Sequence, residues 1–383
     1  MTGVNDWTRG SMIKLCLVRV KGVRYRLNRN NIYPIILALL AALLFGASAP
    51  IAKLLLGEIE PISLAAFLYL GSGFGLLILQ IYQRNGNKAK STEAPLKITD
   101  MGWLAGAIIA GGIAAPIILL FGLRDTPGAT ASLLLSFECV ATTLIAAMVF
   151  KESISRRAWW AILVITTASI LLSANLNNEW GLSWGAMGIL AACVLWGIDN
   201  NFTRNISAKN PKSIVMVKGL AAGSFSLILA IILGNQIPDL GIAIKAMLLG
   251  SLSYGLSITL FIRAMRGLGA ARTSALFGTA PLAGVVLSFF LLRESLNAMF
   301  MVALPLMIIG AILLVYEEHN HNHVHEATHH EHLHKHDDEQ HLHDHETPEF
   351  ARSHSHWHEH SYLEHDHHHM PDIHHRHVHP SEG

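Results

Sequence analysis

The chain has 383 residues, of which 51% are hydrophobic and only 14% are charged, and its mean hydropathy is +0.39. Soluble domains carry about 25% charged residues, so this composition excludes a soluble enzyme. All 24 histidines lie in residues 319–383, where 13 Asp and Glu outnumber 3 Lys and Arg, whereas the preceding residues hold 25 Lys and Arg against 14 Asp and Glu. The net charge of +1 is therefore a cancellation between two unlike segments. Only three cysteines occur, widely spaced, and they predict no disulfide framework.

Residues 1–31 carry seven Lys and Arg and lack the apolar core and small-residue cleavage site of a signal peptide. They predict a basic cytoplasmic extension of the amino terminus. A start codon assigned too far upstream explains them equally well.

The next part of the chain consists of long apolar runs. A helix needs roughly 20 apolar residues to cross about 30 Å of hydrocarbon. Short connections with Gly, Pro or Asn separate the runs, and the pattern predicts an all-α membrane protein with ten crossing helices. The predicted spans are 33–56, 62–82, 101–122, 127–149, 157–175, 182–203, 212–234, 242–264, 270–292 and 297–316.

Basic residues alternate between the two ends of these spans. With the amino terminus in the cytoplasm, twenty Lys and Arg fall on that side and four on the other. Cytoplasmic loops of membrane proteins are enriched in Lys and Arg. We therefore expect a multi-pass protein of the cell (cytoplasmic) membrane with both termini in the cytoplasm.

The chain also repeats itself. Residues 120–153 align with 262–295 at an offset of 142, which places Lys151-Glu152-Ser153 on Arg293-Glu294-Ser295. Upstream, Phe45-Gly46 aligns with Trp196-Gly197 and Lys53 with Arg204 at an offset of 151. Because five spans separate the copies, the second copy is inverted, as in many secondary transporters. Chance similarity between apolar helices is the alternative.

These stretches resemble the drug/metabolite transporter superfamily, in particular the ten-span type of its EamA family. The resemblance covers 32–316 and predicts a first repeat at 32–176, a second at 177–318, and a tail at 319–383. Its motifs are Phe45 through Lys53 with Trp196 through Asn201, and Ala131 through Ser153 with Thr273 through Ser295. Cys139 stands where the family often has proline and where the second half has Pro281.

The resemblance implies a central cavity, alternating access, no ATP-binding domain, no required cofactor and small organic cargo. It leaves the solute and the coupling ion open. No feature of the sequence indicates nucleic-acid binding, and none decides between a monomer and a homodimer.

Ionisable groups inside spans are costly and mark candidate sites. Glu138 lies at the centre of 127–149, on a face with small and hydroxyl-bearing residues. We expect it to bind a cationic or amine group or to carry a proton; a structural, protonated carboxyl is the alternative.

Asp199 and Lys218 are predicted at a similar depth near the cytoplasm, where they form either an ion pair or part of a substrate gate. Asn200 is a candidate for orienting a substrate, although an amide near a helix end often satisfies backbone groups. Trp196 and Tyr254 are weaker candidates for the cavity lining, since most aromatic residues in spans pack or face lipid. For Lys53 and Arg204 we expect side chains that extend to water at opposite surfaces.

The tail at 319–383 has no stretch able to build a core, and we expect it to be disordered. Neutral imidazole is a good ligand for Zn, Ni, Co and Cu, so the tail is predicted to bind such a metal without one fixed geometry. The candidate ligands are His319, His321, His323, His325, His341, His343, His345, His367, His368 and His369.

Together these features predict a secondary transporter in the lipid bilayer that moves a small organic metabolite or drug-like solute, as an exporter and with protons as the candidate coupling ion. A transition-metal (Ni, Co or Zn) transporter loaded by the tail is the second hypothesis. A metal-responsive membrane receptor is the third. The spans contain no histidine, which favours organic cargo over metal.

Overall fold

The computed structural model describes most of the apolar region and parts of the two ends. The described residues are 19–20, 23–24, 29–85, 94–150, 156–175, 181–206, 209–294, 298–315, 319–325, 328–334, 354–360 and 363–369. Helices account for the whole membrane part among them. They are α1 (Arg29–Gly46), α2 (Ser48–Leu55), α3 (Pro61–Asn85), η1 (Ile98–Asp100), α4 (Met101–Ala107), η2 (Ile108–Ala114), α5 (Ala115–Arg124), α6 (Gly128–Leu134), α7 (Phe137–Phe150), α8 (Arg156–Ser173), α9 (Trp184–Asn205), α10 (Pro211–Ile232), α11 (Leu240–Gly250), η3 (Ser251–Leu256), α12 (Ser257–Phe277), α13 (Ala280–Leu292) and α14 (Ala298–Val315).

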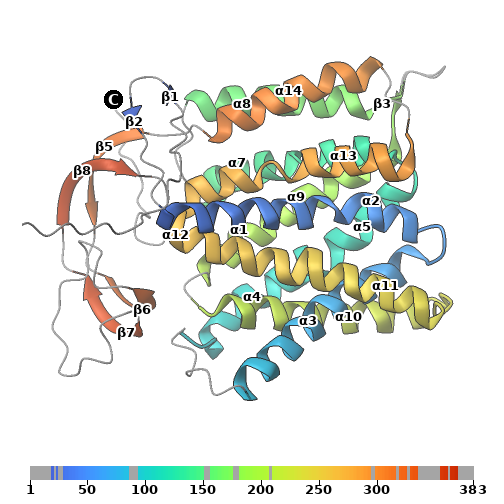
Figure 1. The fold of residues 1–383 in the computed structure, drawn as a ribbon, viewed down its shortest axis with the longest axis horizontal. Coiled ribbons are helices and arrows are strands. Elements are labelled where there is room, and N and C mark those ends of the chain that lie inside the picture. Colours follow the sequence, from blue (N-terminus) through green and yellow to red (C-terminus); the bar gives the residue numbers. More distant parts are fainter. Residues whose placement is uncertain are drawn as a thin grey trace, which may run out of the picture.

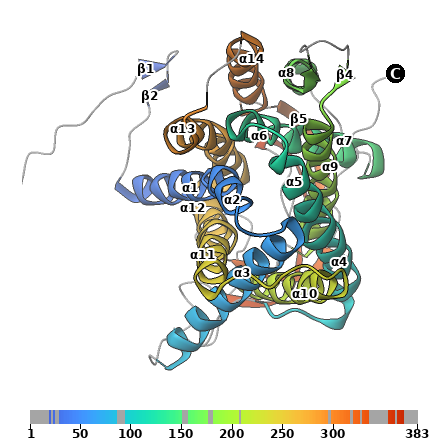
Figure 2. The same ribbon diagram turned by 90° about the vertical axis from the view of Figure 1, so that its right-hand side faces the viewer.

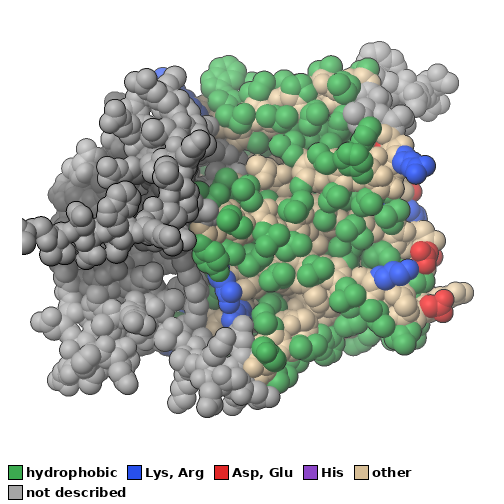
Figure 3. Space-filling model, viewed as in Figure 1, with side chains coloured by type: hydrophobic (Ala, Val, Ile, Leu, Met, Phe, Trp, Pro, Cys, Tyr) green, Lys and Arg blue, Asp and Glu red, His purple; other side chains and the backbone are tan. Residues whose placement is uncertain are grey.

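The helices run side by side and form one bundle (Figure 1). Seen along the helices, α3 pairs with α10 on one side and α8 with α14 on the opposite side (Figure 2). We call α1, α11, α12 and α13 the first flank and α4, α5, α7 and α9 the second flank; they lie on opposite sides of the bundle axis, with α2 and α6 between them. Hydrophobic side chains cover the lateral surface in view, while charged ones gather at its end (Figure 3). This distribution suits a protein surrounded by lipid.

Six helical stretches among the described residues are long and apolar enough to cross a membrane, and two shorter apolar helices follow. The six are Tyr33–Leu55, Pro61–Tyr82, Ile98–Arg124, Gly128–Val149, Pro211–Ile232 and Leu240–Ala264. A multi-pass membrane protein is therefore confirmed, whereas ten crossings stay a prediction. The predicted spans 157–175 and 182–203 are present as α8 and α9, which are not among these six stretches.

Several predicted spans are interrupted. The first breaks at Ala47, between α1 and α2, because Pro50 has no N–H to donate to the preceding turn. The fourth breaks between Leu134 and Phe137, at the place that corresponds to the break before α13 in the second half. The first half therefore has this break although it carries Cys139 where the second half has Pro281. The sequence predicts two separate spans, 242–264 and 270–292. This separation is wrong, because the single helix α12 (Ser257–Phe277) runs from one predicted span into the other without a break.

Two helices contain π-helical turns, η2 and η3, at places 142 to 143 residues apart. In η2 the N–H of Ala115 bonds the carbonyl of Ala110, and the next residue, Pro116, has no N–H. The carbonyl of Gly111 therefore lacks the donor that would continue the π pattern. π-Turns are frequent at functional sites because they expose such backbone groups.

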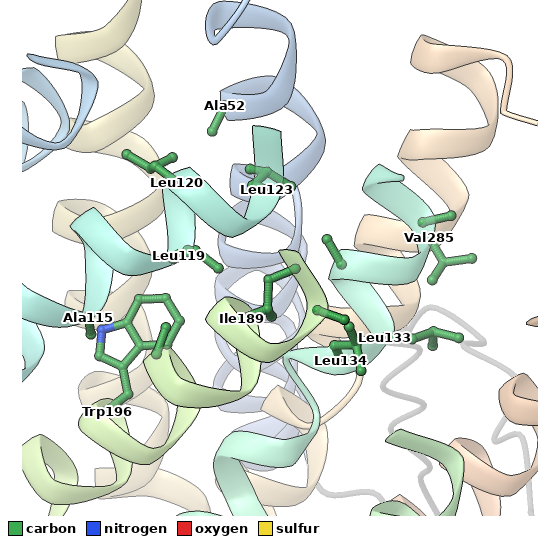
Figure 4. Close-up of a cluster of buried hydrophobic side chains, with 14 of the residues drawn as sticks. Ala52, Ala115, Leu119, Leu120, Leu123, Leu133, Leu134, Ile189, Trp196 and Val285 are labelled. Carbon is green, nitrogen blue, oxygen red and sulfur yellow. The ribbon is translucent and has the colours of Figure 1, made fainter. Parts of the chain in front are cut away.

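One apolar core joins the two predicted repeats. Ile189 and Trp196 of α9 pack in the same cluster as Leu119, Leu133 and Leu134, which precede them by more than 50 residues (Figure 4). The repeats therefore share their interior. Because lipid tails are as apolar as these side chains, close van der Waals packing rather than removal from water holds the helices together here.

Short paired strands lie near both ends of the chain and between α8 and α9. β1 (Arg19–Val20) pairs with β2 (Val23–Arg24), and β3 (Ala174–Asn175) with β4 (Gly181–Leu182). In the tail, β5 (His319–His325) pairs with β8 (Leu363–His369), and β6 (Thr328–His334) with β7 (His354–His360). The described segments of the tail are these extended strands, and the disorder expected for 319–383 stays a prediction.

Candidate functional site

The carbonyl of Gly111 is the centre of a buried polar cluster. It accepts hydrogen bonds from the Oη of Tyr69 at 2.7 Å and from the Nε1 of Trp196 at 3.1 Å. All three groups are buried. The side chains thus supply the donors that Pro116 cannot supply, and they tie α3 and α9 to the π-turn of η2.

An ion pair lies beside this carbonyl. The Nζ of Lys218 bonds the Oδ2 of Asp199, and the Oδ1 of Asp199 accepts a bond from the Oγ1 of Thr203 at 3.0 Å. Asp199 is buried at 5% exposure. A Cβ on Gly111 would lie 1.9 Å from the Asp199 Oδ2, so only glycine fits there. The ion pair that the sequence offered as one of two hypotheses is therefore present.

Glu138 makes a different contact. Its Oε1 accepts a hydrogen bond from the Nδ2 of Asn200 at 2.8 Å, and the same amide donates to the Oγ1 of Thr142 at 3.2 Å. Among the described side chains, no Lys or Arg forms an ion pair with Glu138. Asn200 is exposed, so this carboxylate and amide stand at an accessible edge of the cluster.

Aromatic rings complete the cluster on the opposite flank. The ring of Tyr254, in η3, lies 5.6 Å from that of Tyr69 and 5.9 Å from that of Phe45 between centroids. Trp196 and Tyr254 are therefore buried, packed residues. Tyr69 connects them through the Gly111 carbonyl and through its own ring.

The structure thus brings all six predicted residues into one neighbourhood. Lys218 bonds Asp199, which directly precedes Asn200 in α9, and Tyr254 reaches the cluster through the ring of Tyr69. Asn200 bonds Glu138, and Trp196 reaches the cluster through Gly111.

Sequence reasoning did not single out Gly111 or Tyr69 as members of the cluster. Pro116 was a signal for a free carbonyl in this region, because a proline in an α-helix leaves the carbonyl four residues earlier without its donor, and the π-turn shifts that position by one to Gly111. Tyr69 was one of several aromatic residues within the spans, and nothing set it apart. Thr142 was visible as a hydroxyl-bearing residue one helical turn from Glu138, on the same face.

Lys53 is half-exposed at one end of the bundle, where it lines a pocket and its Nζ also bonds backbone carbonyls. It folds onto the second flank, where its Nζ donates to the carbonyls of Leu123 at 2.9 Å and of Thr126. Nearby, the Glu294 carboxylate accepts bonds from the backbone N–H of Gly128 at 2.7 Å and of Ala129 at 2.9 Å. These contacts define what we call the Lys53 end of the bundle. At the opposite end, Lys209 pairs with Asp100, and we call it the Asp100 end.

The tail strands place histidines at opposite register positions. His319, His321 and His323 of β5 stand opposite His369, His367 and His365 of β8. His325 and His368 lie in the same sheet, opposite Leu363 and Asn320. The candidate ligands His341, His343 and His345 lie outside the described residues. Within the part of the chain whose side chains are described, no group of three or more His, Cys, Asp or Glu is close enough to hold a metal ion.

Comparison with known proteins follows the same division of the chain. The family model for the EamA-like transporter family matches residues 32–174 and again residues 183–316. A relative from Methanothermobacter thermautotrophicus, named an uncharacterized transporter, is 28% identical over 290 residues, which are 72% of this chain and 84% of the relative. A relative from Salmonella typhimurium, named a probable amino-acid metabolite efflux pump, is 28% identical over 183 residues, or 47% of this chain and 56% of that protein.

A crystal structure with 18% sequence identity superimposes with a TM-score of 0.55 and covers 73% of this chain and 94% of that chain. This likeness concerns the fold alone. The family matches cover more than half of the residues, and both named relatives are described as a transporter or a pump. The chain therefore belongs to the EamA-like transporter family and is a multi-pass membrane transporter rather than an enzyme.

Proposed function

We propose that this transporter is a secondary active exporter of a small organic metabolite that carries an amino group, and that it works by alternating access. The observation that carries the proposal is the Glu138–Asn200 contact. Asp199 is neutralised by Lys218, whereas Glu138 has no such partner among the described side chains. A carboxylate inside a membrane without a cation of its own is suited to an ammonium group or a proton. The name of the Salmonella relative supports an amino-acid-like cargo.

The two halves are proposed to be inverted five-helix copies, ten spans in all. The family model matches twice, and the π-turns η2 and η3 lie at the spacing of the sequence repeat. The contacts agree with a two-fold relation. Contacts of α1 with α12 and α13 correspond to contacts of α9 with α5 and α7, while α3 pairs with α10 and α8 with α14. Substrate sites of such transporters lie between the repeats near mid-membrane.

The Asp100 end is proposed to face the cytoplasm of the cell. The sequence places twenty Lys and Arg toward this side and four toward the other. Both termini are then cytoplasmic, and the Lys53 end faces outward.

Proteoliposomes test the cargo and the role of Glu138 together. We expect uptake or efflux of labelled neutral amino acids but not of the corresponding 2-hydroxy acids, which lack the amino group. Glu138→Gln should lower amino-acid transport at least tenfold, which corresponds to about 1.4 kcal/mol, within the range of a charge-assisted hydrogen bond. The matched control is Glu58→Gln, on an exposed residue outside the cluster. Equal transport by Glu138→Gln and wild type would refute this role.

Proton coupling needs its own measurement. If Glu138 carries the proton, an imposed pH gradient drives transport by the wild type and not by Glu138→Gln. An unchanged pH response in that variant, with transport retained, would contradict the coupling.

A second candidate function concerns transition metals, and the opposed register positions of His319 and His369, and of His321 and His367, favour it. Imidazole pairs on neighbouring strands suit Zn, Ni, Co or Cu. We propose that the tail binds such a metal and modulates the transporter. Removing 319–383 should abolish most Zn²⁺ binding, measured by calorimetry, and leave amino-acid transport intact. Loss of metal flux without the tail would instead favour metal as cargo, and metal-dependent signalling without any flux would favour a receptor.

A further inference from the structure

Asn200 is exposed, although it lies on the side of α9 that faces away from lipid. The exposed apolar residues of α9, Trp184, Met187 and Val194, recur at helical spacing and mark its outer side. Ala191, exposed on that same side, precedes Asn200 by nine residues. At about 100° per residue, this separation turns the two side chains to opposite sides of the helix. The exposed surface of Asn200 therefore borders a space inside the bundle.

Asn200 and Glu138 each keep an acceptor atom free at this edge. The Nδ2 of Asn200 has two N–H groups, which donate to the Oε1 of Glu138 at 2.8 Å and to the Oγ1 of Thr142 at 3.2 Å. Within the part of the chain that the structure describes, neither the Oδ1 of Asn200 nor the Oε2 of Glu138 accepts a hydrogen bond. Two acceptors on adjacent side chains, one of them charged, are thus available to a ligand.

The N–H and phenol donors of the cluster are already bound to groups of the protein. The ammonium of Lys218 bonds the Asp199 carboxylate. The Oη of Tyr69 and the Nε1 of Trp196 both donate to the carbonyl of Gly111. The edge described above therefore matches a ligand group that donates hydrogen bonds rather than one that accepts them.

The aromatic rings of the cluster offer no alternative site for a cation. Quaternary ammonium ions are recognised by open aromatic faces that surround the cation. Here the rings of Tyr69 and Tyr254 pack on each other, Phe45 packs on Tyr254, and Trp196 is buried as well. Because the protein itself covers these faces, hydrogen-bond acceptors rather than rings are left to recognise the ligand.

We infer that this edge selects ammonium groups that carry at least two N–H donors, which are primary and secondary amines, and rejects tertiary and quaternary ammonium groups. The inference rests on the proposed function, in which Glu138 binds the amino group of the cargo. Glu138 supplies the charge and one acceptor, and Asn200 supplies the second acceptor and is a specificity-determining residue. A quaternary ammonium has the same charge but leaves both acceptors without a donor, and a site built for hydrogen bonds rejects such an analogue.

A series of N-methylated probes tests the inference by isothermal titration calorimetry of the full-length protein in detergent. The probes are butylammonium and its N-methyl, N,N-dimethyl and N,N,N-trimethyl derivatives, all of them cations at neutral pH. We expect similar affinity for the first two, a loss of about tenfold for the dimethyl probe and a further loss of about tenfold for the trimethyl probe. Each step removes one charge-assisted hydrogen bond.

Three results in this series would overturn the inference. Equal affinities would show that charge alone is recognised. Affinities that rise with each methyl group would show apolar binding, since each buried methyl adds favourable transfer free energy. Absence of butylammonium binding would show that the edge takes no ammonium group. A loss confined to the trimethyl probe would assign recognition to Glu138 alone and exclude the role of Asn200.

Asn200→Leu measures the second acceptor directly. The three N–H bonds of an ammonium group diverge, so one carboxylate takes one of them, and the tenfold step between the N-methyl and N,N-dimethyl probes should disappear in this variant. Asn205→Leu is the matched control on the same helix, because that side chain donates to the Asn201 carbonyl and lies outside the cluster. An undiminished step in Asn200→Leu would contradict the inference, and the wild-type series decides it even if this variant does not fold.

Binding of alkylammonium probes does not depend on amino acids being the cargo, which separates the two proposals. A graded loss of affinity without amino-acid transport refutes the proposed cargo and supports the selectivity. Amino-acid transport together with equal affinity for all four probes does the reverse.

Discussion

The Gly111 carbonyl accepts two side-chain hydrogen bonds, and this arrangement leads to a prediction about stability. Tyr69→Phe removes one hydrogen-bond donor to its carbonyl, and Trp196→Phe removes the other. After either change the buried carbonyl keeps one partner, because the remaining side chain still donates. After both changes it has none, since Pro116 cannot donate along the helix.

The magnitudes follow from this difference. Loss of one hydrogen bond costs about 1 kcal/mol, whereas a buried group left without any partner costs about 1–3 kcal/mol more. The smaller ring of Trp196→Phe adds a packing cost that a double-mutant cycle cancels. We therefore expect the double variant to be less stable than the sum of the single variants by about 1–3 kcal/mol.

The assay is thermal unfolding of detergent-solubilised protein. In proteins of somewhat smaller size, 1 kcal/mol corresponds to about 2–4 °C, so the excess shift is expected to be several degrees. Pro116→Ala restores an N–H at that position and should remove most of the excess. Tyr82→Phe, on an exposed ring, is the control. The reasoning would be refuted if the stability losses of the two single variants add up to that of the double variant within about 0.5 kcal/mol. It would also be refuted if the extra loss in the double variant persists when Pro116→Ala is added.

Three further predictions concern single sites. Gly111→Ala places a Cβ 1.9 Å from the Asp199 Oδ2 and should lower folded yield or transport at least tenfold, whereas Gly102→Ala, with nothing within 4 Å, should leave both unchanged in expression and flux assays. Lys218→Met leaves the buried Asp199 unpaired and should cost about 3–5 kcal/mol of stability in denaturation, while adding Asp199→Asn should recover most of it; no recovery would indicate that the pair does more than neutralise charge. Arg293 ends α13 with φ 51°, a left-handed backbone conformation that is unfavourable for a residue with a side chain. Arg293→Gly should therefore stabilise the protein by about 1 kcal/mol in the same measurement, and a destabilised variant would contradict the strain that we assign to this conformation.

Much of the architecture follows from the sequence alone. Apolar length determined the membrane-embedded helices, because no other backbone arrangement of these segments satisfies its hydrogen bonds in lipid. Glu138, Asp199 and Lys218 could be singled out because charged groups inside a span are costly. The 142-residue offset between the copies also agrees with the spacing of η2 and η3, which the sequence did not predict as π-turns.

Only the tertiary structure decided which of these groups meet. The pairing of Glu138 with Asn200 depends on the packing of α9 against α7, and that of Asp199 with Lys218 on the packing of η2 against both α9 and α10. No local pattern encodes either arrangement. The sequence predicted that Lys53 reaches one membrane surface, and only the fold showed that its Nζ bonds carbonyls at the end of α5 there. Tyr69 and Gly111 joined the site because a free carbonyl in one helix takes its donors from whichever helices pack beside it, and that choice belongs to the assembled bundle.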